Sequence, residues 1–237
     1  MVRALREGAA TWGLELDSNQ LSLFSSFLNC LTRGAARLNL TAIREPREVV
    51  FKHFLDSLAG VLVVEPAAGH RVIDIGSGAG FPGLPLKIAR PELELTLLEP
   101  SRKKAAFLRN VVAELGLSGV QVVPARAEEA GRDPAHRGRY DYALARAVAE
   151  IRVLVEYSLP LLRPQGLFVA YKGPGAVDEL ERAGPALATL GGTVRDVLEF
   201  KLPGEEARRS LIIIENTAPT PDRYPRRPGM AAKRPVS

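Results

Sequence analysis

Cysteine and histidine are scarce in this sequence. It contains one cysteine, Cys30, and three histidines that lie far apart in the chain. A single cysteine cannot form an internal disulfide, and its apolar helical surroundings predict an ordinary buried thiol. Metal sites need several ligands at short spacings, and the cysteine and histidines form no such cluster. We therefore expect neither a disulfide nor a metal site.

Long apolar runs are missing as well. The longest near-continuous run, Leu58 to Val64, is far shorter than the roughly 20 residues that a membrane-spanning helix needs. The N-terminal stretch also lacks the apolar core of a secretion signal. We expect a cytoplasmic protein with no membrane partner. The 237 residues, 46% of them apolar, suffice for one α/β domain with a small extension, and we expect a monomer.

Negative charge is scarce at the end of the chain. From Asn216 to Ser237 there are five basic residues and one acid, Asp222, so this segment carries +4 of the total charge of +5. A proline-rich basic end can simply be a solvated terminus, which is the usual case for a charge run. Arginine also pairs well with phosphate oxygens, so the composition equally suits contacts with nucleic acid.

The hydrophobic pattern changes at about residue 70. Before it, a capping box at Asp17 to Gln20 precedes one amphipathic helix, and Pro46 opens a second. After it, short apolar runs alternate with helical windows, which predicts βαβ units and a parallel sheet. We expect strands at 71–75, 94–99, 120–123, 140–145, 166–171, 193–200 and 209–215, and helices near 82–90, 101–115, 149–162 and 175–188.

The sequence thus predicts an α/β fold with a doubly wound, seven-stranded, mostly parallel sheet. Only residues 202–207 join the last two strands, whereas a parallel pair requires a crossover of about a dozen residues, so the last strand should be antiparallel. We assign residues 1–68 to a small N-terminal helical extension, 69–217 to the main domain and 218–237 to a basic tail. The polar stretch 35–45 is expected to be a loop that faces a ligand.

A glycine-rich segment follows the first predicted strand and precedes a predicted helix. It contains Gly76-x-Gly78-x-Gly80 and also Gly78-x-Gly80-x-x-Gly83, the pattern of dinucleotide-binding loops. Tight strand-to-helix turns need glycine for steric reasons alone, so the neighbouring residues have to decide. Asp74, two residues before the first glycine, can hold backbone amides of the loop or meet a cationic ligand. A carboxylate there disfavours a pyrophosphate and favours a cofactor that carries positive charge.

Polar residues end the next strands at the same edge of the sheet. Glu99 ends the second strand, where a carboxylate can accept two hydrogen bonds from a ribose diol; a solvated acid is the simpler alternative. Ala127 and Glu128 follow the third strand and could contact an adenine edge. Arg146 ends the fourth strand, where an arginine is more often structural but can also bind a carboxylate through two hydrogen bonds.

These features as a set resemble the class I S-adenosylmethionine-dependent methyltransferases over residues 70–215: the pattern hhDhGxGxG, the acid after the second strand, the turn at Ala127 and the final hairpin. The motif [D/N/S]-P-P-[Y/F/W], common in methylation of exocyclic amines, is absent after the fourth strand, where the chain has Ala145-Arg-Ala-Val148. Methylation of a cytosine carbon needs a thiolate near that edge, and Cys30 belongs to the N-terminal helix. What remains is a substrate atom that is already nucleophilic.

A closer resemblance rests on IGSGAGFPGLPL, on LNLTAIREP followed by HFLDSL, on LARAV and on the tail TPDRYPRRPGMAAKRP. Over nearly the whole chain the sequence looks like the bacterial 16S ribosomal RNA guanine-N7 methyltransferase family, once called glucose-inhibited division protein B. The resemblance implies S-adenosylmethionine as cofactor, 16S ribosomal RNA or the small subunit as partner, and a guanosine near the decoding centre as substrate. It places in the cofactor site Gly76, Phe81, Glu99, Pro100, Ser101, Ala127, Glu128 and Arg146, to which the loop argument adds Asp74 and Gly78.

Guanine N7 has a free lone pair and no proton to lose. In-line attack on the sulfonium methyl therefore needs positioning and electrostatic support, and we expect no general base. The candidate RNA contacts, each of which could instead be a solvated side chain, are Asn39, Thr41, Arg44, Lys52, His53, Lys172, Arg208, Arg209, Arg223, Arg226 and Arg227. Two other functions stay open: a nicotinamide-dependent oxidoreductase, suggested by the second glycine pattern with Glu99, and an RNA-binding module without catalysis.

Overall fold

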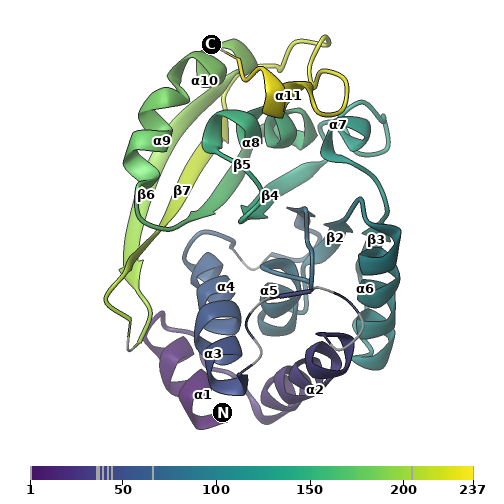
Figure 1. Cartoon of the computed structure of the whole chain (residues 1–237), viewed down its shortest axis with the longest axis vertical. Coiled ribbons are helices and arrows are strands. Elements are labelled where there is room, and N and C mark those ends of the chain that lie inside the picture. The colour runs from purple at the N-terminus through teal and green to yellow at the C-terminus, as the bar shows by residue number, and fades with distance from the viewer. Residues whose placement is uncertain are drawn as a thin grey trace.

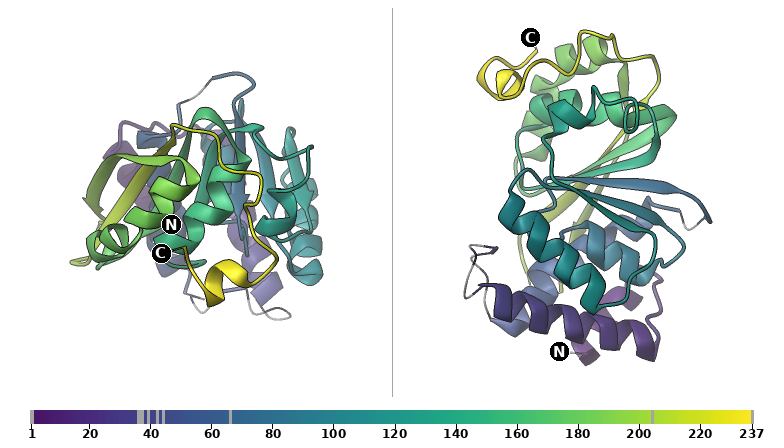
Figure 2. Two further views of the ribbon diagram at one scale, coloured as in Figure 1. Left: turned by 90° about the horizontal axis from the view of Figure 1, so that it is seen from above. Right: turned by 90° about the vertical axis from the view of Figure 1, so that its right-hand side faces the viewer.

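A seven-stranded sheet runs through the molecule and carries helices on both faces (Figure 1, Figure 2). The computed structural model describes residues 2–35, 38, 40, 41, 43, 45–65, 67–203 and 205–236. The strands are β1 (Arg71–Ile75), β2 (Glu94–Leu98), β3 (Val120–Val123), β4 (Tyr140–Arg146), β5 (Leu162–Lys172), β6 (Gly192–Lys201) and β7 (Arg208–Asn216).

The strand order is β3-β2-β1-β4-β5-β7-β6. β1 pairs in parallel with β2 and β4, whereas β7 is antiparallel to both β5 and β6. The predicted doubly wound sheet with an antiparallel last strand is therefore confirmed. The order reverses direction at β1, between β2 and β4, and in open α/β sheets ligands bind beyond the carboxyl ends of the strands at such a point.

Helices occupy both ends of the chain and most of the connections. Before the sheet lie α1 (Val2–Ala10), α2 (Ser18–Ala35), α3 (Pro46–Val49), the π-helical η1 (Val50–Leu55), α4 (Asp56–Leu58) and the 3₁₀ turn η2 (Ala59–Leu62). The others are α5 (Gly83–Ala89), α6 (Arg102–Glu114), α7 (Ala127–Ala130), α8 (Ile151–Ser158), η3 (Leu159–Leu161), α9 (Ala176–Arg182), α10 (Gly184–Leu190) and α11 (Met230–Lys233). No helix among these described residues is both long and apolar enough to cross a membrane.

The expected elements differ from the structure in several places, among them the short helices α7 and α11, which the sequence pattern does not predict. The sequence pattern does not predict α1, and it predicts one helix over 175–188 where the structure has α9 and α10. That helix is interrupted because Gly184 and Pro185 follow α9, and proline has no N–H to continue the hydrogen-bond ladder. β5 begins at Leu162, four residues before the expected strand.

Alternating side chains of the strands build one core on each face of the sheet. Val72 and Leu144 join the core formed with α1 to α6, whereas Ile73 and Ala143 join the core formed with α8 and α10. This is the period of two that a strand covered on both faces requires. Figure 1 shows the two helical layers on opposite sides of the strands. The N-terminal helices share a core with the sheet, and the division at residue 68 stays a prediction.

The N-terminal helices are fixed to the sheet by capping and by side-chain contacts. Gln20 N donates to Asp17 Oδ1 at 2.7 Å and Asp17 N donates to Gln20 Oε1 at 2.9 Å, which confirms the predicted capping box. Gln20 Nε2 also donates to the carbonyl oxygens of Ile88 and Ala89 at the end of α5, each at 3.1 Å. Pro46 begins α3 as predicted.

Candidate functional site

The glycine loop begins where β1 ends and lies beside the end of β2. Gly76 N and Ser77 N both donate to the Leu98 carbonyl oxygen, at 2.8 and 3.2 Å, and Ser77 Oγ donates to the Asp74 carbonyl oxygen at 2.9 Å. These bonds hold the loop against the edge of the sheet at the point where the strand order reverses. The loop is thus a fixed surface over which a ligand can lie.

The glycines of the loop adopt backbone angles that other residues avoid. Gly76, Gly78 and Gly80 have φ of 70°, 58° and 101°. A Cβ on Gly76 would lie 2.9 Å from Val148, and one on Gly80 would lie 3.0 Å from Leu84 Cγ. Around Gly78 the nearest atom to such a Cβ is the Gly76 carbonyl oxygen at 3.8 Å, so the space above this residue is open. A ligand can therefore approach the backbone closely at Gly78.

Glu99 is the acidic residue at this edge. Its side chain is 5% exposed; Oε2 accepts from Gly78 N at 2.9 Å and Oε1 accepts from Ser101 N at 2.8 Å. Each carboxylate oxygen has a second lone pair, so both can still accept a hydrogen bond from a ligand hydroxyl. The carboxylate therefore shapes the loop and remains an acceptor for a diol.

Asp74 lies beneath the loop and is fully buried. Its Oδ2 accepts from Gly83 N, at the start of α5, at 3.0 Å. Oδ1 has no hydrogen-bond partner among the described residues, and burial raises the pKa of this carboxyl to about 7. Of the two expected roles, the structure shows a contact with a backbone amide; contact with a cationic ligand stays a prediction.

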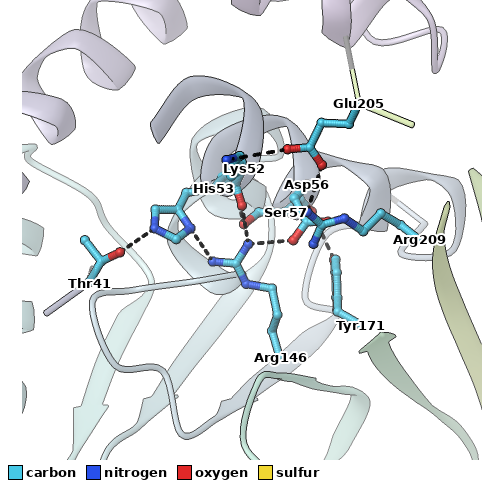
Figure 3. A network of polar contacts seen from close by, with 9 residues as sticks. All are labelled: Thr41, Lys52, His53, Asp56, Ser57, Arg146, Tyr171, Glu205 and Arg209. Carbon is cyan, nitrogen blue, oxygen red and sulfur yellow. Dashed lines mark hydrogen bonds and ion pairs between the residues drawn. The ribbon is translucent and has the colours of Figure 1, made fainter. Parts of the chain in front are cut away.

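Arg146, at the end of β4, is bound to the N-terminal helical segment (Figure 3). Its Nη1 donates to Asp56 Oδ2 at 2.7 Å and to the Lys52 carbonyl oxygen at 3.2 Å, while Nη2 contacts His53 Nδ1 at 3.1 Å. The guanidinium carbon lies 5.0 Å from the centre of the Phe81 ring. This arrangement fixes the arginine head at the carboxyl edge of the sheet.

His53 lies in η1, a π-helical segment, and its ring stacks on Phe81 with centroids 4.6 Å apart. Because arginine can only donate, the contact with Arg146 makes His53 Nδ1 the acceptor, so Nε2 carries the proton and donates to Thr41 Oγ1 at 2.7 Å. Burial, and next the charge of Arg146, lowers the pKa of His53 to about 4. The imidazole is therefore neutral at neutral pH, with both nitrogens engaged.

A cavity of about 330 Å³ opens beside this network. Its lining includes Lys52, Asp56, Arg146, Tyr171, Lys172 and Arg209, which come from η1, α4, β4, β5 and β7. Ala147, also in the lining, has a φ of 56° directly after β4, and such left-handed backbone in a residue other than glycine is concentrated at functional sites. The cavity lies at the same end of β4 as the predicted crevice.

The basic residues of this cavity are largely paired within the chain. Lys52 Nζ lies 2.6 Å from Glu48, Lys172 Nζ lies 2.6 Å from Glu179, and Arg209 contacts Glu205 at 3.0 Å and Asp56 at 3.8 Å. Arg208, outside the cavity, pairs with the exposed Glu199. A phosphate ligand would have to compete with these carboxylates.

The remaining predicted cofactor residues lie along the ends of β2 and β3. Pro100 is exposed, and Ser101 caps α6 by accepting from Lys104 N at 3.4 Å. Ala127 is 8% exposed, and Glu128 is buried, with Oε1 accepting from Gly229 N at 2.8 Å. The structure thus brings the loop, Glu99 and the start of α7 to one edge, whereas Glu128 contacts the C-terminal segment.

The predicted RNA contacts that the structure describes come from several parts of the chain, among them η1, β5, β7 and the C-terminal segment. Arg226 pairs with the buried Glu156, and its contact with RNA stays a prediction. Arg223 and Arg227 are exposed. Asn39 and Arg44 lie outside the described residues, as does much of the expected ligand-facing loop. Among the described residues, no three histidine, cysteine, aspartate or glutamate side chains gather to hold a metal ion.

Sequence reasoning did not identify Asp56 as part of the site. Asp56 is 4% exposed and interrupts an apolar run between Leu55 and Leu58. A charged residue within an apolar helical pattern needs a buried partner, and that signal could have indicated a role for it. Its partner Arg146 lies 90 residues further along the chain.

The sequence is similar to a known protein family over most of its length. The family model described as "GidB: rRNA small subunit methyltransferase G" matches residues 20–211. A protein of Roseiflexus castenholzii named ribosomal RNA small subunit methyltransferase G is 53% identical over 228 residues, which are 96% of this chain and 97% of that one. A protein of the same name from Rubrobacter xylanophilus is 50% identical, over 98% of this chain and 90% of that one.

Solved structures resemble this chain in fold alone. M. jannaschii TYW2 in complex with AdoMet has a TM-score of 0.55 at 12% identity and covers 76% of this chain and 78% of its own. The [4+2]-cyclase SpnF has a TM-score of 0.55 at 15% identity, with coverages of 86% and 97%. Since a cyclase shares the architecture, the fold by itself does not determine the reaction.

Proposed function

The chain belongs to the GidB family, rRNA small subunit methyltransferase G, and on that premise we propose that it transfers a methyl group from S-adenosylmethionine to N7 of a guanosine in 16S ribosomal RNA near the decoding centre. The observation that carries the proposal is the family match, because it spans the glycine loop, Glu99 and Arg146 in one alignment. Family membership supports the methyltransferase activity on small-subunit ribosomal RNA; the donor and the acceptor atom are our proposals.

The residues at the carboxyl edge fit this cofactor. The open space at Gly78 admits close approach of the methionine backbone, and Glu99 retains lone pairs for the ribose hydroxyls. The start of α7 offers the Ala127 region to the adenine. When bound, S-adenosylmethionine would supply an electrophilic methyl group on a positively charged sulfur.

Arg146 is proposed to bind the methionine carboxylate. A guanidinium has five N–H groups, of which the contacts with Asp56, His53 and the Lys52 carbonyl use three. Among the described residues, the Nε–H and one Nη2–H have no partner. These two donors can bind a second carboxylate while the first three keep the side chain in place, so Asp56 acts as a positioning residue for Arg146.

The chemistry at N7 requires orientation and no proton transfer to the protein. The lone pair of guanine N7 must approach the methyl carbon in line, at about 3 Å, and positive charge then moves onto the purine. His53, the histidine nearest this network, has both ring nitrogens in hydrogen bonds and a pKa lowered to about 4. These contacts engage both nitrogens of His53, and the absence of a general base is part of the proposal.

Transfer of label tests the proposal. The protein is incubated with tritiated S-adenosylmethionine and small subunits that lack the modification, and the labelled RNA is digested and its nucleosides are mapped by mass. We expect label in one guanosine, at N7. Label at another atom would refute the proposed acceptor, and a folded protein that binds RNA without transferring label would support a binding module.

Calorimetry separates the cofactors. We expect S-adenosylhomocysteine to bind and NADH not to bind. Binding heat with NADH but not with S-adenosylhomocysteine would instead support a nicotinamide-dependent oxidoreductase. Arg146→Ala should weaken S-adenosylhomocysteine binding more than RNA binding, and an equal loss of both would contradict the role given to this residue.

A further inference from the structure

The C-terminal segment, residues 217–236, is docked on the domain. Thr217 N and Ala218 N donate to the Gly191 carbonyl oxygen at 2.9 and 3.0 Å, and Thr220 Oγ1 donates to the Leu190 carbonyl oxygen at 2.9 Å. Figure 1 shows the segment continuing over the end of the molecule that holds α7, α8 and α10. Its composition suggests a solvated tail, but its contacts make it part of the folded domain.

Two buried carboxylates of the domain receive hydrogen bonds from this segment. Glu156 in α8 is 1% exposed and accepts from Arg226 N at 2.8 Å and from Arg226 Nη2 at 2.6 Å. Glu128 in α7 is 4% exposed and accepts from Gly229 N at 2.8 Å. A buried carboxylate is costly unless it is paired and hydrogen-bonded. The segment therefore supplies partners that the domain needs.

The same segment contacts the end of α7. Arg132 Nε donates to the Pro225 carbonyl oxygen at 2.7 Å, and Arg137 Nη1 donates to the carbonyl oxygens of Gly131 and Tyr224, each at 2.8 Å. A Cβ on Gly131 would lie 2.8 Å from Pro225 Cγ, so the proline ring packs closely on the Gly131 backbone. α7 is four residues long, and so short a helix is not stable without tertiary contacts.

We propose that residues 224–229 are a positioning segment for the cofactor site. They hold α7 at the place where Ala127 and Glu128 meet the adenine of the cofactor. The inference rests on the proposed function, because that function places the adenine at α7. Arg226 and Gly229 act through α8 and α7 and do not themselves touch the cofactor. The segment thus matters for cofactor affinity, whether or not its exposed arginines also contact RNA.

The test compares two arginines of the segment that carry the same charge. Arg226→Ala removes the side-chain anchor on Glu156, whereas Arg234→Ala removes an exposed arginine and serves as the matched control. Binding of S-adenosylhomocysteine is measured by calorimetry at 10 °C, with circular dichroism to check the fold. Hydrogen bonds to charged groups contribute enough that we expect Arg226→Ala to weaken binding about tenfold, with Arg234→Ala unchanged.

Steady-state kinetics distinguish positioning from mere stabilisation. Arg226→Ala should raise the KM for S-adenosylmethionine and leave kcat at saturating cofactor close to wild type, since α7 can be ordered by the cofactor itself. A purely structural contact would lower the melting temperature and leave the dissociation constant at 10 °C unchanged. An unchanged dissociation constant in a folded Arg226→Ala protein would overturn the inference.

A second variant covers the case in which Arg226→Ala does not fold. Glu156→Gln combined with Arg226→Met removes both charges together, so no unpaired carboxylate stays buried. We expect this pair also to bind S-adenosylhomocysteine more weakly, and wild-type affinity would overturn the inference. If the folded wild-type protein does not bind S-adenosylhomocysteine at all, the proposed function fails, and the inference fails with it.

Discussion

Replacing Asp56 by alanine removes the carboxylate that lies between Arg146 and Arg209. The Asp56 and Arg146 side chains are 6% and 12% exposed, and their closest atoms are 2.7 Å apart. Removing one partner of a buried ion pair costs about 3–5 kcal/mol, because the other charge is left without a partner in a poorly solvated place. The Arg209 side chain is 26% exposed and can recover some hydration when Asp56 is removed. We therefore expect Asp56→Ala to lower the free energy of unfolding by about 3 kcal/mol, the lower end of this range.

Urea unfolding, followed by circular dichroism, measures this loss. A protein of this size should have a slope of about 2.5 kcal/mol per molar urea, so the midpoint should fall by about 1.2 M without a change in slope. The control is Glu7→Ala, which breaks the exposed pair between Arg3 and Glu7 and should leave the midpoint unchanged.

A midpoint shift below about 0.4 M for Asp56→Ala would refute the reasoning, because the pair would then contribute no more than a solvent-exposed one. In that case the contact with Asp56 would be too weak to hold Arg146 in position. A lower slope with a small shift would instead indicate a more compact unfolded state or a transition that is not two-state, and unfolding followed by fluorescence would distinguish the two.

Further predictions concern the loop, the histidine and the exposed arginines. Gly78→Ala should weaken S-adenosylhomocysteine binding, while Gly69→Ala, with a similar positive φ and equally open surroundings, should cost similar stability and leave binding unchanged. Because the folded-state pKa of His53 is about 4, below its ordinary 6.5, its contribution to stability is complete above pH 6.5 and is lost as the pH falls towards 4. The loss should reach about 3 kcal/mol, and His53→Gln should abolish it in urea titrations across this range. Replacing Arg223 and Arg227 together by alanine should reduce RNA affinity and the slope of its salt dependence; an unchanged slope would show that neither contacts phosphate.

The sheet could be predicted almost completely from the sequence. Most strands contain a short apolar run between turns, and this signal depends on neighbouring residues alone. The antiparallel direction of β7 followed from the short connection 202–207, because chain length limits how strands can be joined. The glycine spacing and Glu99 likewise indicated the edge at which we propose that the cofactor binds, since ligands of open α/β sheets lie beyond the carboxyl ends of the strands.

The short helices were less predictable, because tertiary contacts decide whether they form. α7 was expected only as a polar turn, and a single helical turn forms here because the C-terminal segment and α8 pack against it. The short α1 gave no signal strong enough to predict, yet its Leu5 is buried in the core shared with α2 and the sheet. Local propensity is weak for such short segments, and packing overrides it.

The sequence by itself determined the fold, the family and the edge of the sheet where we propose that the cofactor binds, because these follow from periodicity and from motifs of adjacent residues. Only the tertiary structure decided which charged side chains form ion pairs within the protein. Arg146 pairs with Asp56 across 90 residues and Arg226 with Glu156 across 70, so one is held at the site and the other anchors the C-terminal segment. The sequence around each arginine does not show its partner, because long-range packing brings a buried carboxylate beside each of them.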